Sequence, residues 1–347
     1  MIKAAVVGAT GYVGQELIRL LYQHPNIDLK IISSRKNINE RYDSIYGNYV
    51  KRSELKFSEN DLKYISQEVD VLFLALPHGV ASNLLNDEVL SNTKVIDMGA
   101  DFRLNDVNIY ENWYGTEHGN PSYIKKSIYG LCELKRDEIK NYSLIANPGC
   151  YTTCSILSLA PIIKEEFINN KSIVIDAKSG VTGAGRSLNM ATHYTECNES
   201  IKAYKIASHR HTPEIEEQLG SLADENINLI FTPHLVPMNR GILTTSYIKL
   251  TKDIHIDDIY HLYRQFYKKE YFIRLLNKDI YPETRWVKGS NYCDLGINLD
   301  KRTNTLVIVG AIDNLIKGAA GQAVQNMNII FNFDETCGLK SIPIFPV

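Results

Sequence analysis

The chain has few cysteines, and no pattern among them is typical of zinc binding or of a disulfide scaffold. Six cysteines are spread over 347 residues, and no C-x-x-C pair occurs. A density this low excludes the small secreted scaffolds that disulfides hold together. Cys150 and Cys154 are one helical turn apart, but no second pair completes four zinc ligands. We therefore expect reduced thiols and no metal site.

The sequence also lacks long apolar runs and an excess of one charge. No segment approaches the roughly 18 consecutive apolar residues that a membrane-spanning helix needs, and no leader-like segment precedes the first expected strand. We expect a cytoplasmic protein with no membrane partner. Lys and Arg number 38 against 40 Asp and Glu, which does not give the basic surface of a nucleic-acid binder. The length favours two domains at about 150 residues each.

Strand and helix patterns alternate in the first hundred residues. A predicted helix at 13–22 follows the first of several short apolar runs, which lie at 4–7, 29–32, 69–76 and 95–97. Strands that alternate with helices predict a parallel sheet with right-handed crossovers. The expected N-terminal domain is therefore an α/β domain with a parallel sheet.

The pattern changes near residue 148. Longer strands with alternating polarity are expected at 172–177 and 243–250, which predicts a sheet with one exposed face. A polar helix is expected at 259–270. A last strand at 306–312 precedes a helix rich in small residues at about 315–331, which we expect to return to the first domain.

Three glycines lie between the first strand and the first helix. Gly8, Gly11 and Gly14 form the spacing G-x-x-G-x-x-G. Gly8 can make the tight turn, Gly11 can let a phosphate approach the backbone, and Gly14 allows close helix–strand packing. The helix start then offers N–H groups to a pyrophosphate. This predicts a dinucleotide site; the alternative is a glycine-rich turn without a ligand.

The end of the second strand bears on which dinucleotide binds. NAD sites usually carry a carboxylate there, which holds the ribose hydroxyls. This chain instead has Ser33, Ser34 and Arg35. Two hydroxyls and a guanidinium can bind a 2′-phosphate, which a carboxylate would repel. We therefore predict NADP, the alternative being an ordinary basic turn.

Cys150 stands at a predicted helix start. Pro148 and Gly149 interrupt the preceding structure, and apolar residues then recur at helical spacing. A helix N-terminus stabilises negative charge, and this lowers the pKa of a thiol. We predict that Cys150 is a nucleophile, against the alternative of a small buried cysteine.

Two histidines could handle the proton. His211 precedes Thr212, a good N-cap, and Pro213, a good first helical residue. The helix dipole should therefore keep the His211 ring neutral near pH 7. His209 could serve instead, and the sequence does not choose between them.

Two further segments could bind anions. The glycine-rich loop 179–186 can offer backbone N–H groups, and Arg186 adds a charged fork. Arg210 is a second candidate for holding phosphate or carboxylate. The segment 233–241 could also bind an anion, but a plain turn between strands explains its sequence equally well.

Together these segments resemble the N-acetyl-γ-glutamyl-phosphate reductase family, whose wider relatives are the aspartate-semialdehyde dehydrogenases. The cysteine and histidine segments are specific, whereas the glycine turn alone is not. The matching segments are GATGYVG at 8–14, PHG at 77–79, ADFRL at 100–104, NPGCYTT at 147–153, SGVTGAGR at 179–186, HRHTPEI at 209–215, FTPHLVPMNRGIL at 231–243, GSNYCD at 289–294 and NLIKGAAGQAVQN at 314–326.

The resemblance implies a domain organisation. An NADP-binding Rossmann domain would comprise residues 1–148 plus about 314–347. A catalytic α+β domain with a mainly antiparallel sheet would comprise about 149–313 and would form the interface of a homodimer or homotetramer. The predicted catalytic residues are Cys150, His211 and His209, and the substrate contacts are Arg186 and Arg210. The predicted cofactor-binding residues are Gly8, Thr10, Gly11, Tyr12, Val13, Gly14, Ser33, Ser34, Arg35, Pro77, Ser179, Gly180 and Asn314.

The implied reaction is NADPH-dependent reduction of an acyl phosphate through a Cys150 thioester, with release of inorganic phosphate. Aspartyl phosphate is the alternative substrate. A non-catalytic NADP sensor is the alternative from another class, but it would need neither Cys150 nor the histidine segment. The chain departs from the family pattern at Thr152 and Cys132, where proline is expected, and at Cys154, where a smaller residue is usual. The two cysteines raise the question of an additional oxidisable thiol.

Overall fold

The computed structural model describes residues 1–346, which form two compact units. The N-terminal unit comprises Met1–Pro148 and Ala319–Lys340, and the second comprises Gly149–Gly318 and the chain from Ser341 onward. The sequence analysis placed 314–347 in the first domain, whereas 314–318 and the end of the chain group with the second unit. The fold class is confirmed for both units.

The N-terminal unit is built on a parallel seven-stranded sheet in the order β3-β2-β1-β4-β5-β7-β6. The order reverses between β1 and β4, and ligands bind at such switch points, outside the carboxyl ends of the strands. The strands are β1 (Ile2–Val7), β2 (Ile27–Ser33), β3 (Phe57–Ser58), β4 (Val71–Leu74), β5 (Lys94–Asp97), β6 (Ser127–Tyr129) and β7 (Leu144–Ala146).

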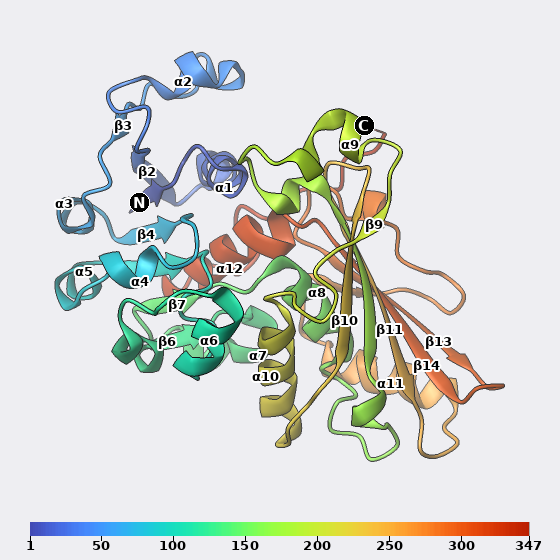
Figure 1. Cartoon of the computed structure of the whole chain (residues 1–347). Coiled ribbons are helices and arrows are strands. Elements are labelled where there is room, and N and C mark those ends of the chain that lie inside the picture. The colour runs from blue at the N-terminus through green and yellow to red at the C-terminus, as the bar shows by residue number, and fades with distance from the viewer. Residues whose placement is uncertain (347) are drawn as a thin grey trace. The chain divides into compact units, whose positions relative to one another are not determined.

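Helices from both ends of the chain pack in this unit. The last helix, α12 (Gly321–Ile330), contacts α1 (Tyr12–Gln23), so it lies among elements formed by the first 148 residues (Figure 1). The other helices are α2 (Tyr42–Ile45), α3 (Leu62–Glu68), α4 (Ala81–Leu84), α5 (Asp87–Asn92), α6 (Val107–Tyr114) and α7 (Cys132–Ile139). Apolar residues of β1, β4, α3 and α5 share one buried core.

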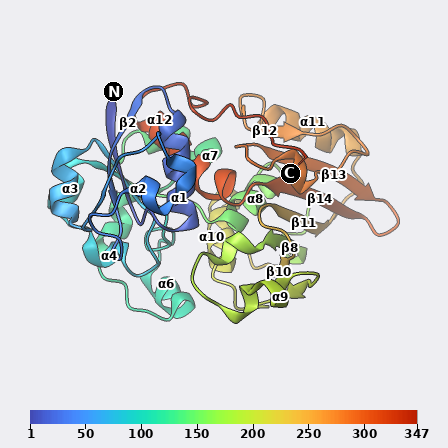
Figure 2. The same cartoon turned by 90° about the horizontal axis from the view of Figure 1, so that it is seen from above.

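The second unit has a mostly antiparallel seven-stranded sheet in the order β12-β13-β14-β11-β8-β10-β9. Figure 2 shows β13, β14, β11, β8 and β10 side by side in that sequence. The strands are β8 (Val174–Gly180), β9 (Lys202–Ala203), β10 (Ile230–Val236), β11 (Ile242–Lys249), β12 (Ile273–Leu275), β13 (Cys293–Asp300) and β14 (Thr305–Ile312).

One face of this sheet is covered, and the other is half-exposed. Helix α8 (Cys150–Leu159) packs on β11 and β14, and α11 (Ile256–Phe266) packs on β13. The remaining helices are α9 (Tyr194–Cys197) and α10 (Thr212–Ala223). In β11, the residues buried under α8 alternate with half-exposed or exposed residues, among them Leu243, Thr245 and Tyr247. The alternation predicted from the sequence is therefore confirmed.

The predicted elements exist, with shifted ends. The polar helix expected at 259–270 spans Ile256–Phe266, because His255 caps its start by accepting a hydrogen bond from the backbone N–H of Asp257. The expected helix 315–331 begins as a π-helical turn at Ile316–Ala320, and α12 follows it. Among the residues described, no helix is both long enough and apolar enough to cross a membrane.

Candidate active site

The glycine turn lies at the carboxyl end of β1. Gly8 has φ +89°, and a side chain there would collide with the carbonyl group of Ala75. A side chain at Gly14 would collide with the carbonyl oxygen of Gly8. Both positions therefore require glycine for the protein's own packing, as the sequence analysis proposed for the turn and for helix–strand contact.

Gly11 differs from these two. A Cβ atom there would meet only the carbonyl oxygen of Gly8, at an ordinary 3.7 Å. No neighbouring protein atom forces glycine at this position, which leaves room for a ligand to approach. Gly11 is the N-cap of α1, and the amides of Tyr12, Val13 and Gly14 open that helix, where N–H groups have no intrahelical acceptor. This geometry fits a pyrophosphate.

Two more predicted cofactor residues lie at the ends of neighbouring strands. Pro77 is exposed in the loop between β4 and α4, where the amides of Gly79 in the loop and Ser82 in α4 donate to the buried Asp101 carboxylate at 2.6 and 2.9 Å. Thr10 lies inside the glycine turn, and its carbonyl oxygen accepts hydrogen bonds from the side chains of Gln15 and Tyr46.

The three predicted cofactor residues at the end of β2 differ in exposure. Ser33 is fully buried, and its hydroxyl donates to Asn60 at 2.7 Å. Ser34 is 5% exposed, and Arg35 is exposed. Of the three, Arg35 is therefore the side chain most accessible to a nucleotide phosphate.

Cys150 is the first residue of α8, with Gly149 as N-cap, and its side chain is half-buried. The structure thus places it where the sequence analysis expected a helix start. A side chain at Gly318 would collide with Cys150 Cβ at 2.7 Å, so the chain passes close to this residue from a distant part of the sequence. Backbone N–H groups at a helix start favour the thiolate form.

His209 lies in an aromatic surrounding that keeps its ring neutral. Its ring contacts those of Tyr151, Tyr204, His211 and Phe231, with centroids 4.8–5.6 Å away. Burial first, and then the nearby positive charges, lower the pKa of His209 to about 2. Its Nδ1 accepts a hydrogen bond from the backbone N–H of His211 at 3.1 Å, so the ring proton lies on Nε2.

His211 is itself the N-cap of α10, one residue earlier than the sequence analysis predicted. The difference arises because the His211 carbonyl oxygen already accepts the first helical hydrogen bond, from the backbone N–H of Ile215 at 3.0 Å. Thr212 and Pro213 then occupy the first two helical positions. His211 is half-buried at this helix start.

The first part of the loop 179–186 is not an open anion nest. The backbone N–H groups of Gly180, Val181 and Thr182 donate to carbonyl oxygens of residues 238–241, at 2.9–3.2 Å. These amides are therefore already occupied, which corrects that part of the sequence analysis. Ser179 and Gly180 are buried at the end of β8.

Asn314 ties the same loop to its neighbour. Its Oδ1 accepts from the backbone N–H of Gly241 at 2.8 Å, and its Nδ2 donates to the Thr182 hydroxyl at 3.0 Å. The segment 233–241 thus holds the loop in place. This agrees with its interpretation as a structural turn between strands. In the structure Asn314 serves as a link between these two segments.

Positive side chains gather near the histidines. Lys205 and Arg210 both lower the pKa of His209 through their charges, and Arg210 also lowers the pKa of Lys205, after burial. Lys205 has a positive φ of 46° although it is not glycine. Arg186 lies exposed beyond the 179–185 loop. An anion would relieve the mutual repulsion of Lys205 and Arg210.

The sequence analysis missed several residues of this site. Tyr151 and Tyr204 pack around His209, and Glu214 accepts a hydrogen bond from the backbone N–H of Gly149 at 2.9 Å. The helical spacing of Glu214 in the HRHTPE segment could have indicated an inward-facing carboxylate. Tyr204 lies in a segment without periodicity and carried no signal.

The two cysteines that depart from the family pattern are fully buried. Cys132 Sγ donates to Asn326 Oδ1 at 3.2 Å, and Cys154 Sγ lies 3.3 Å from the Thr244 hydroxyl. A hydrogen bond with Cys154 first, and then burial, raise the pKa of the Cys293 thiol. Burial disfavours the thiolate, the form that reacts with oxidants, so the structure gives no support to an additional oxidisable thiol at Cys132 or Cys154.

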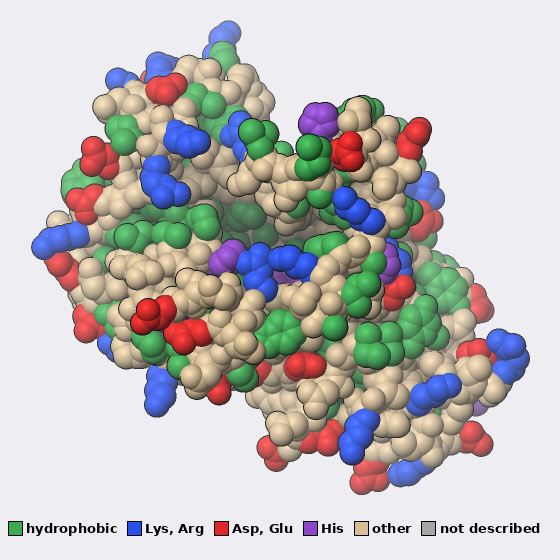
Figure 3. All heavy atoms as spheres, viewed as in Figure 1, with side chains coloured by type: hydrophobic (Ala, Val, Ile, Leu, Met, Phe, Trp, Pro, Cys, Tyr) green, Lys and Arg blue, Asp and Glu red, His purple; other side chains and the backbone are tan. Residues whose placement is uncertain are grey.

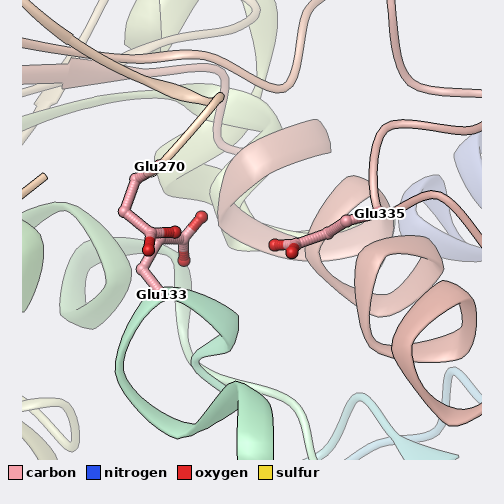
Figure 4. A group of neighbouring side chains, drawn as sticks. All are labelled: Glu133, Glu270 and Glu335. Atoms are coloured by element: carbon pink, nitrogen blue, oxygen red, sulfur yellow. The ribbon is translucent and has the colours of Figure 1, made fainter. Parts of the chain in front are cut away.

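Two carboxylates of the N-terminal unit serve its packing. Figure 4 shows Glu133 on α7 and Glu335 beyond α12; Glu270, also drawn, belongs to the other unit. The Gln325 amide donates to Glu133 at 3.0 Å and to Glu335 at 2.6 Å. Arg136 donates to both oxygens of Glu335. These bonds tie α7 to the end of the chain's last helix.

The surface carries charges of both signs. In Figure 3, basic and acidic side chains are interspersed over the visible face of the molecule, with apolar side chains between them. This matches the near-zero net charge of −2.

Family comparisons cover nearly the whole chain. Residues 3–142 match the model for the semialdehyde dehydrogenase NAD binding domain, and residues 150–314 match that for the semialdehyde dehydrogenase dimerisation domain. A protein of Lachnospira eligens named N-acetyl-gamma-glutamyl-phosphate reductase is 53% identical over 348 residues, covering 100% of both chains. A protein of the same name from Campylobacter jejuni is 51% identical, covering 98% of both.

Solved structures share the fold at low sequence identity. Aspartate semialdehyde dehydrogenase II of Vibrio cholerae, complexed with ASA, superposes with a TM-score of 0.71 at 16% identity, covering 96% of this chain and 98% of that one. The Candida albicans aspartate semialdehyde dehydrogenase with NADP gives 0.69 at 17% identity, covering 95% and 98%. By its full-length relatives and both domain models, the chain belongs to the N-acetyl-gamma-glutamyl-phosphate reductase family.

Proposed function

We propose that this enzyme reduces N-acetyl-γ-glutamyl phosphate to N-acetylglutamate 5-semialdehyde, with release of phosphate, in arginine biosynthesis. The observation that carries the proposal is the pair of helix starts at Cys150 and His211. Glu214, in the first turn of α10, accepts a hydrogen bond from Gly149 at the start of α8. The hydrogen bond between Gly149 and Glu214 thus joins the helix start that carries the Cys150 thiol to the helix start that carries the His211 imidazole. The names of the full-length relatives support the same reaction.

The proposed chemistry uses Cys150 as nucleophile. His211 takes the thiol proton, and the thiolate attacks the acyl carbonyl carbon. The C–O bond to phosphate breaks, phosphate leaves, and a thioester on Cys150 remains. When bound, the reduced nicotinamide supplies the hydride that the thioester needs. The C–S bond then breaks, so that the aldehyde departs and Cys150 is again a thiolate.

His211 is the better candidate for the acid and base. A ring whose pKa is about 2, as burial makes that of His209, cannot take up a second proton near neutral pH and so cannot act as the base. His209 instead orients His211 through the hydrogen bond to its backbone N–H. Arg210 and Lys205 provide positive charge for the phosphate or carboxylate of the substrate, and Arg186 is a further candidate.

The NAD-binding domain calls for a nicotinamide dinucleotide, and we propose that it is NADP. Gly8, Gly11 and Gly14 shape the turn, and the amides of Tyr12 and Val13 would hold the pyrophosphate. The exposed Arg35 would hold the 2′-phosphate, and no carboxylate stands at 33–36 to repel it. The roles of Thr10, Pro77, Ser179, Gly180 and Asn314 at the cofactor stay predictions.

We also propose a homodimer or homotetramer. The half-exposed face of the second sheet carries apolar residues on adjacent strands, since Tyr247 pairs with Val174 on β8 and with Val307 on β14. The match of 150–314 to a dimerisation domain supports assembly through this unit. A cytoplasmic location stays a prediction.

The reverse reaction tests the substrate. The purified enzyme is given phosphate and oxidised cofactor, with either N-acetylglutamate 5-semialdehyde or aspartate 4-semialdehyde, and formation of reduced cofactor is followed at 340 nm. We expect phosphate-dependent turnover with the acetylated aldehyde at least about 100-fold above the other, because the site must leave charged or polar groups unmatched by the wrong substrate. Equal rates, or a preference for the aspartyl compound, would contradict the proposal.

Cofactor choice is measured in the same assay with NADP⁺ and NAD⁺. The variant Arg35→Asp should lose about 10-fold or more of its kcat/KM for NADP⁺, since a carboxylate replaces a charge-assisted hydrogen bond with repulsion. Its kcat/KM for NAD⁺ should hold or rise. Lys30→Asp is the control, since Lys30 is an exposed residue of β2 that is paired with Asp28. If the ratio of kcat/KM for NADP⁺ to kcat/KM for NAD⁺ is unchanged in Arg35→Asp, Arg35 does not bind the 2′-phosphate.

A further inference from the structure

A buried carboxylate joins the two helix starts of the proposed active site. Glu214 is 1% exposed. Its Oε1 accepts from the backbone N–H of Gly149 at 2.9 Å and lies 2.8 Å from the Thr152 hydroxyl oxygen. Gly149 and Thr152 flank Cys150 on α8, and Glu214 follows His211 by three residues on α10.

The Thr152 hydroxyl lies within hydrogen-bond distance of the Glu214 carboxylate and of the Gly149 carbonyl oxygen. The Thr152 hydroxyl has one proton and two acceptors in reach, since the Gly149 carbonyl oxygen also lies 2.6 Å away. That carbonyl oxygen already accepts from the Thr153 amide at 2.9 Å and from the Thr153 hydroxyl at 3.0 Å. The one Thr152 proton is therefore shared between the Gly149 carbonyl oxygen and the Glu214 carboxylate, and the hydrogen bond to the carboxylate is of the stronger, charge-assisted kind.

The arrangement resembles a capping box made across two helices. In a capping box, a Glu or Gln at the third helical position accepts from the backbone N–H of the N-cap residue. In α8 the N-cap is Gly149 and the third position is Thr152, whose side chain is too short for that bond. Glu214 of α10 supplies the acceptor instead, and Thr152 holds its carboxylate in place.

We propose that Glu214 is a positioning residue for Cys150, and that the Thr152 hydroxyl fixes it in that role. The three groups form what we call the Glu214 clasp: the Gly149 N–H, the Thr152 O–H and the Glu214 carboxylate. The clasp sets the position of the Cys150 backbone relative to His211 by tying the start of α8 to the start of α10. This inference rests on the proposed function, since it assigns Cys150 and His211 the reacting roles.

Four variants test the clasp, and Thr153 offers a matched control. Thr152→Val removes the hydroxyl that reaches Glu214. Thr153→Val removes a hydroxyl that is equally buried and also bonds to Gly149 O, but that has no bond to Glu214. Glu214→Gln keeps an oxygen that can accept both hydrogen bonds, whereas Glu214→Ala removes it. Each variant is measured for kcat, for KM of aldehyde and cofactor, for the pH profile of kcat, and for thermal unfolding.

We expect kcat to differ between Thr152→Val and Thr153→Val, and between Glu214→Ala and Glu214→Gln. It should fall about 100-fold in Glu214→Ala and several-fold in Thr152→Val, because displacing a reacting group by about 1 Å can cost that much. The KM for the cofactor should stay within about twofold, since the clasp lies outside the glycine turn. Glu214→Gln should recover most of the Ala loss. Thr153→Val should unfold at a temperature similar to Thr152→Val and keep the wild-type kcat.

The double variant Thr152→Val/Glu214→Ala provides an independent check. If Thr152 acts through Glu214, the double variant should be no slower than Glu214→Ala alone, because groups that act as one unit are not additive. If Glu214→Ala does not fold, the comparison of Thr152→Val with Thr153→Val still decides. Equal losses of kcat in these two threonine variants, or multiplicative losses in the double variant, would overturn the clasp.

Failure of the clasp is distinguishable from failure of the proposed function. Cys150→Ser is measured beside the other variants. If Cys150→Ser retains most of the wild-type rate, the proposed function is wrong, and the clasp has no reacting group to position. If Cys150→Ser is inactive while Glu214→Ala and Thr152→Val turn over at the wild-type rate, only the clasp is wrong.

Discussion

Two histidines separated by one residue differ in what their rings can do with a proton. His209 lies among aromatic rings, and its Nδ1 is occupied by the backbone N–H of His211. Its lowered pKa, near 2, follows from burial first and from His211, Lys205 and Arg210 next. The sequence alone could not separate the two residues, because both lie in the same short segment before a helix. The tertiary packing of Tyr204 and Phe231 against His209 distinguishes them, whereas Tyr151 contacts both rings.

The pH dependence of the two histidine variants follows from this difference. His209→Asn keeps an acceptor near the Nδ1 position and removes a ring that stays neutral across pH 5–9. Its pH profile should therefore keep the wild-type shape, with a loss of kcat below about 10-fold. In His211→Asn, kcat should fall by about 100-fold or more. The pH profile of kcat should also lose the slope that arises from protonation of the acid and base.

The measurement is kcat against pH from 5 to 9 in the reverse direction, with thermal unfolding as the control for folding. If His209→Asn proves to be the variant that loses this slope, the assignment is reversed. His209 would then have to hold its proton in the enzyme, contrary to the effect of its buried surroundings.

At the scale of elements, the sequence predicted more of the fold than of the site. Strand β1, the glycine turn and α1 were predictable because their signals are local: an apolar run, three spaced glycines and helical periodicity. The start of α8 was predictable for the same reason, from Pro148 and Gly149. The occupied amides of loop 179–186 were not, because their acceptors come from residues 238–241, more than fifty positions away.

The carboxyl end of β5 holds a second feature that the sequence could not reveal. Asp97 is fully buried, and burial, followed by the charge of Asp101, raises its pKa to about 7. Its Oδ1 accepts from the Gly99 N–H at 3.0 Å, while its Oδ2 is buried without a hydrogen-bond partner among residues 1–346. Nothing in the pattern of Val95, Ile96 and Asp97 distinguishes this carboxyl from an ordinary one at a strand end.

The contribution of Asp97 to stability should consequently fall as pH rises from about 4 to 7. In that window the folded protein holds the Asp97 proton, whereas the unfolded chain, with an ordinary pKa, has released it. Raising the pH therefore favours the unfolded chain until Asp97 ionises in the folded state. Asp97→Asn removes the titration and keeps an acceptor for Gly99. It should stabilise the protein at pH 8 by roughly 2–4 kcal/mol and leave it nearly unchanged at pH 4.5.

Urea unfolding of the wild type and of Asp97→Asn at pH 4.5, 6 and 8 gives the comparison. Asp137→Asn is the control, because its carboxylate on α7 is almost fully exposed and paired with Lys140. A constant difference between Asp97→Asn and the wild type at all three pH values would refute the raised pKa as the cause.

At the scale of the whole molecule, the chain crosses between its two units three times, and the first two crossings lie beside residues of the proposed site. The first crossing falls between Pro148 and Gly149, immediately before Cys150, and the second falls between Gly318 and Ala319, inside the π-helical turn Ile316–Ala320. The returning helix α12 was anticipated from its small residues. The grouping of 314–318 with the second unit was not, because Asn314 is held there by Thr182 and Gly241.

The central claim is that Cys150 carries the acyl group between phosphate and the nicotinamide. It is tested most directly by giving the enzyme N-acetylglutamate 5-semialdehyde and NADP⁺ without phosphate, and then determining the mass of the Cys150 peptide. We predict a burst of about one NADPH per active site and a Cys150 peptide heavier by one N-acetylglutamyl group, which added phosphate removes. Cys150→Ser should show neither. An unmodified Cys150 in wild-type enzyme that produces the burst, or the acyl group on another residue, would contradict the account.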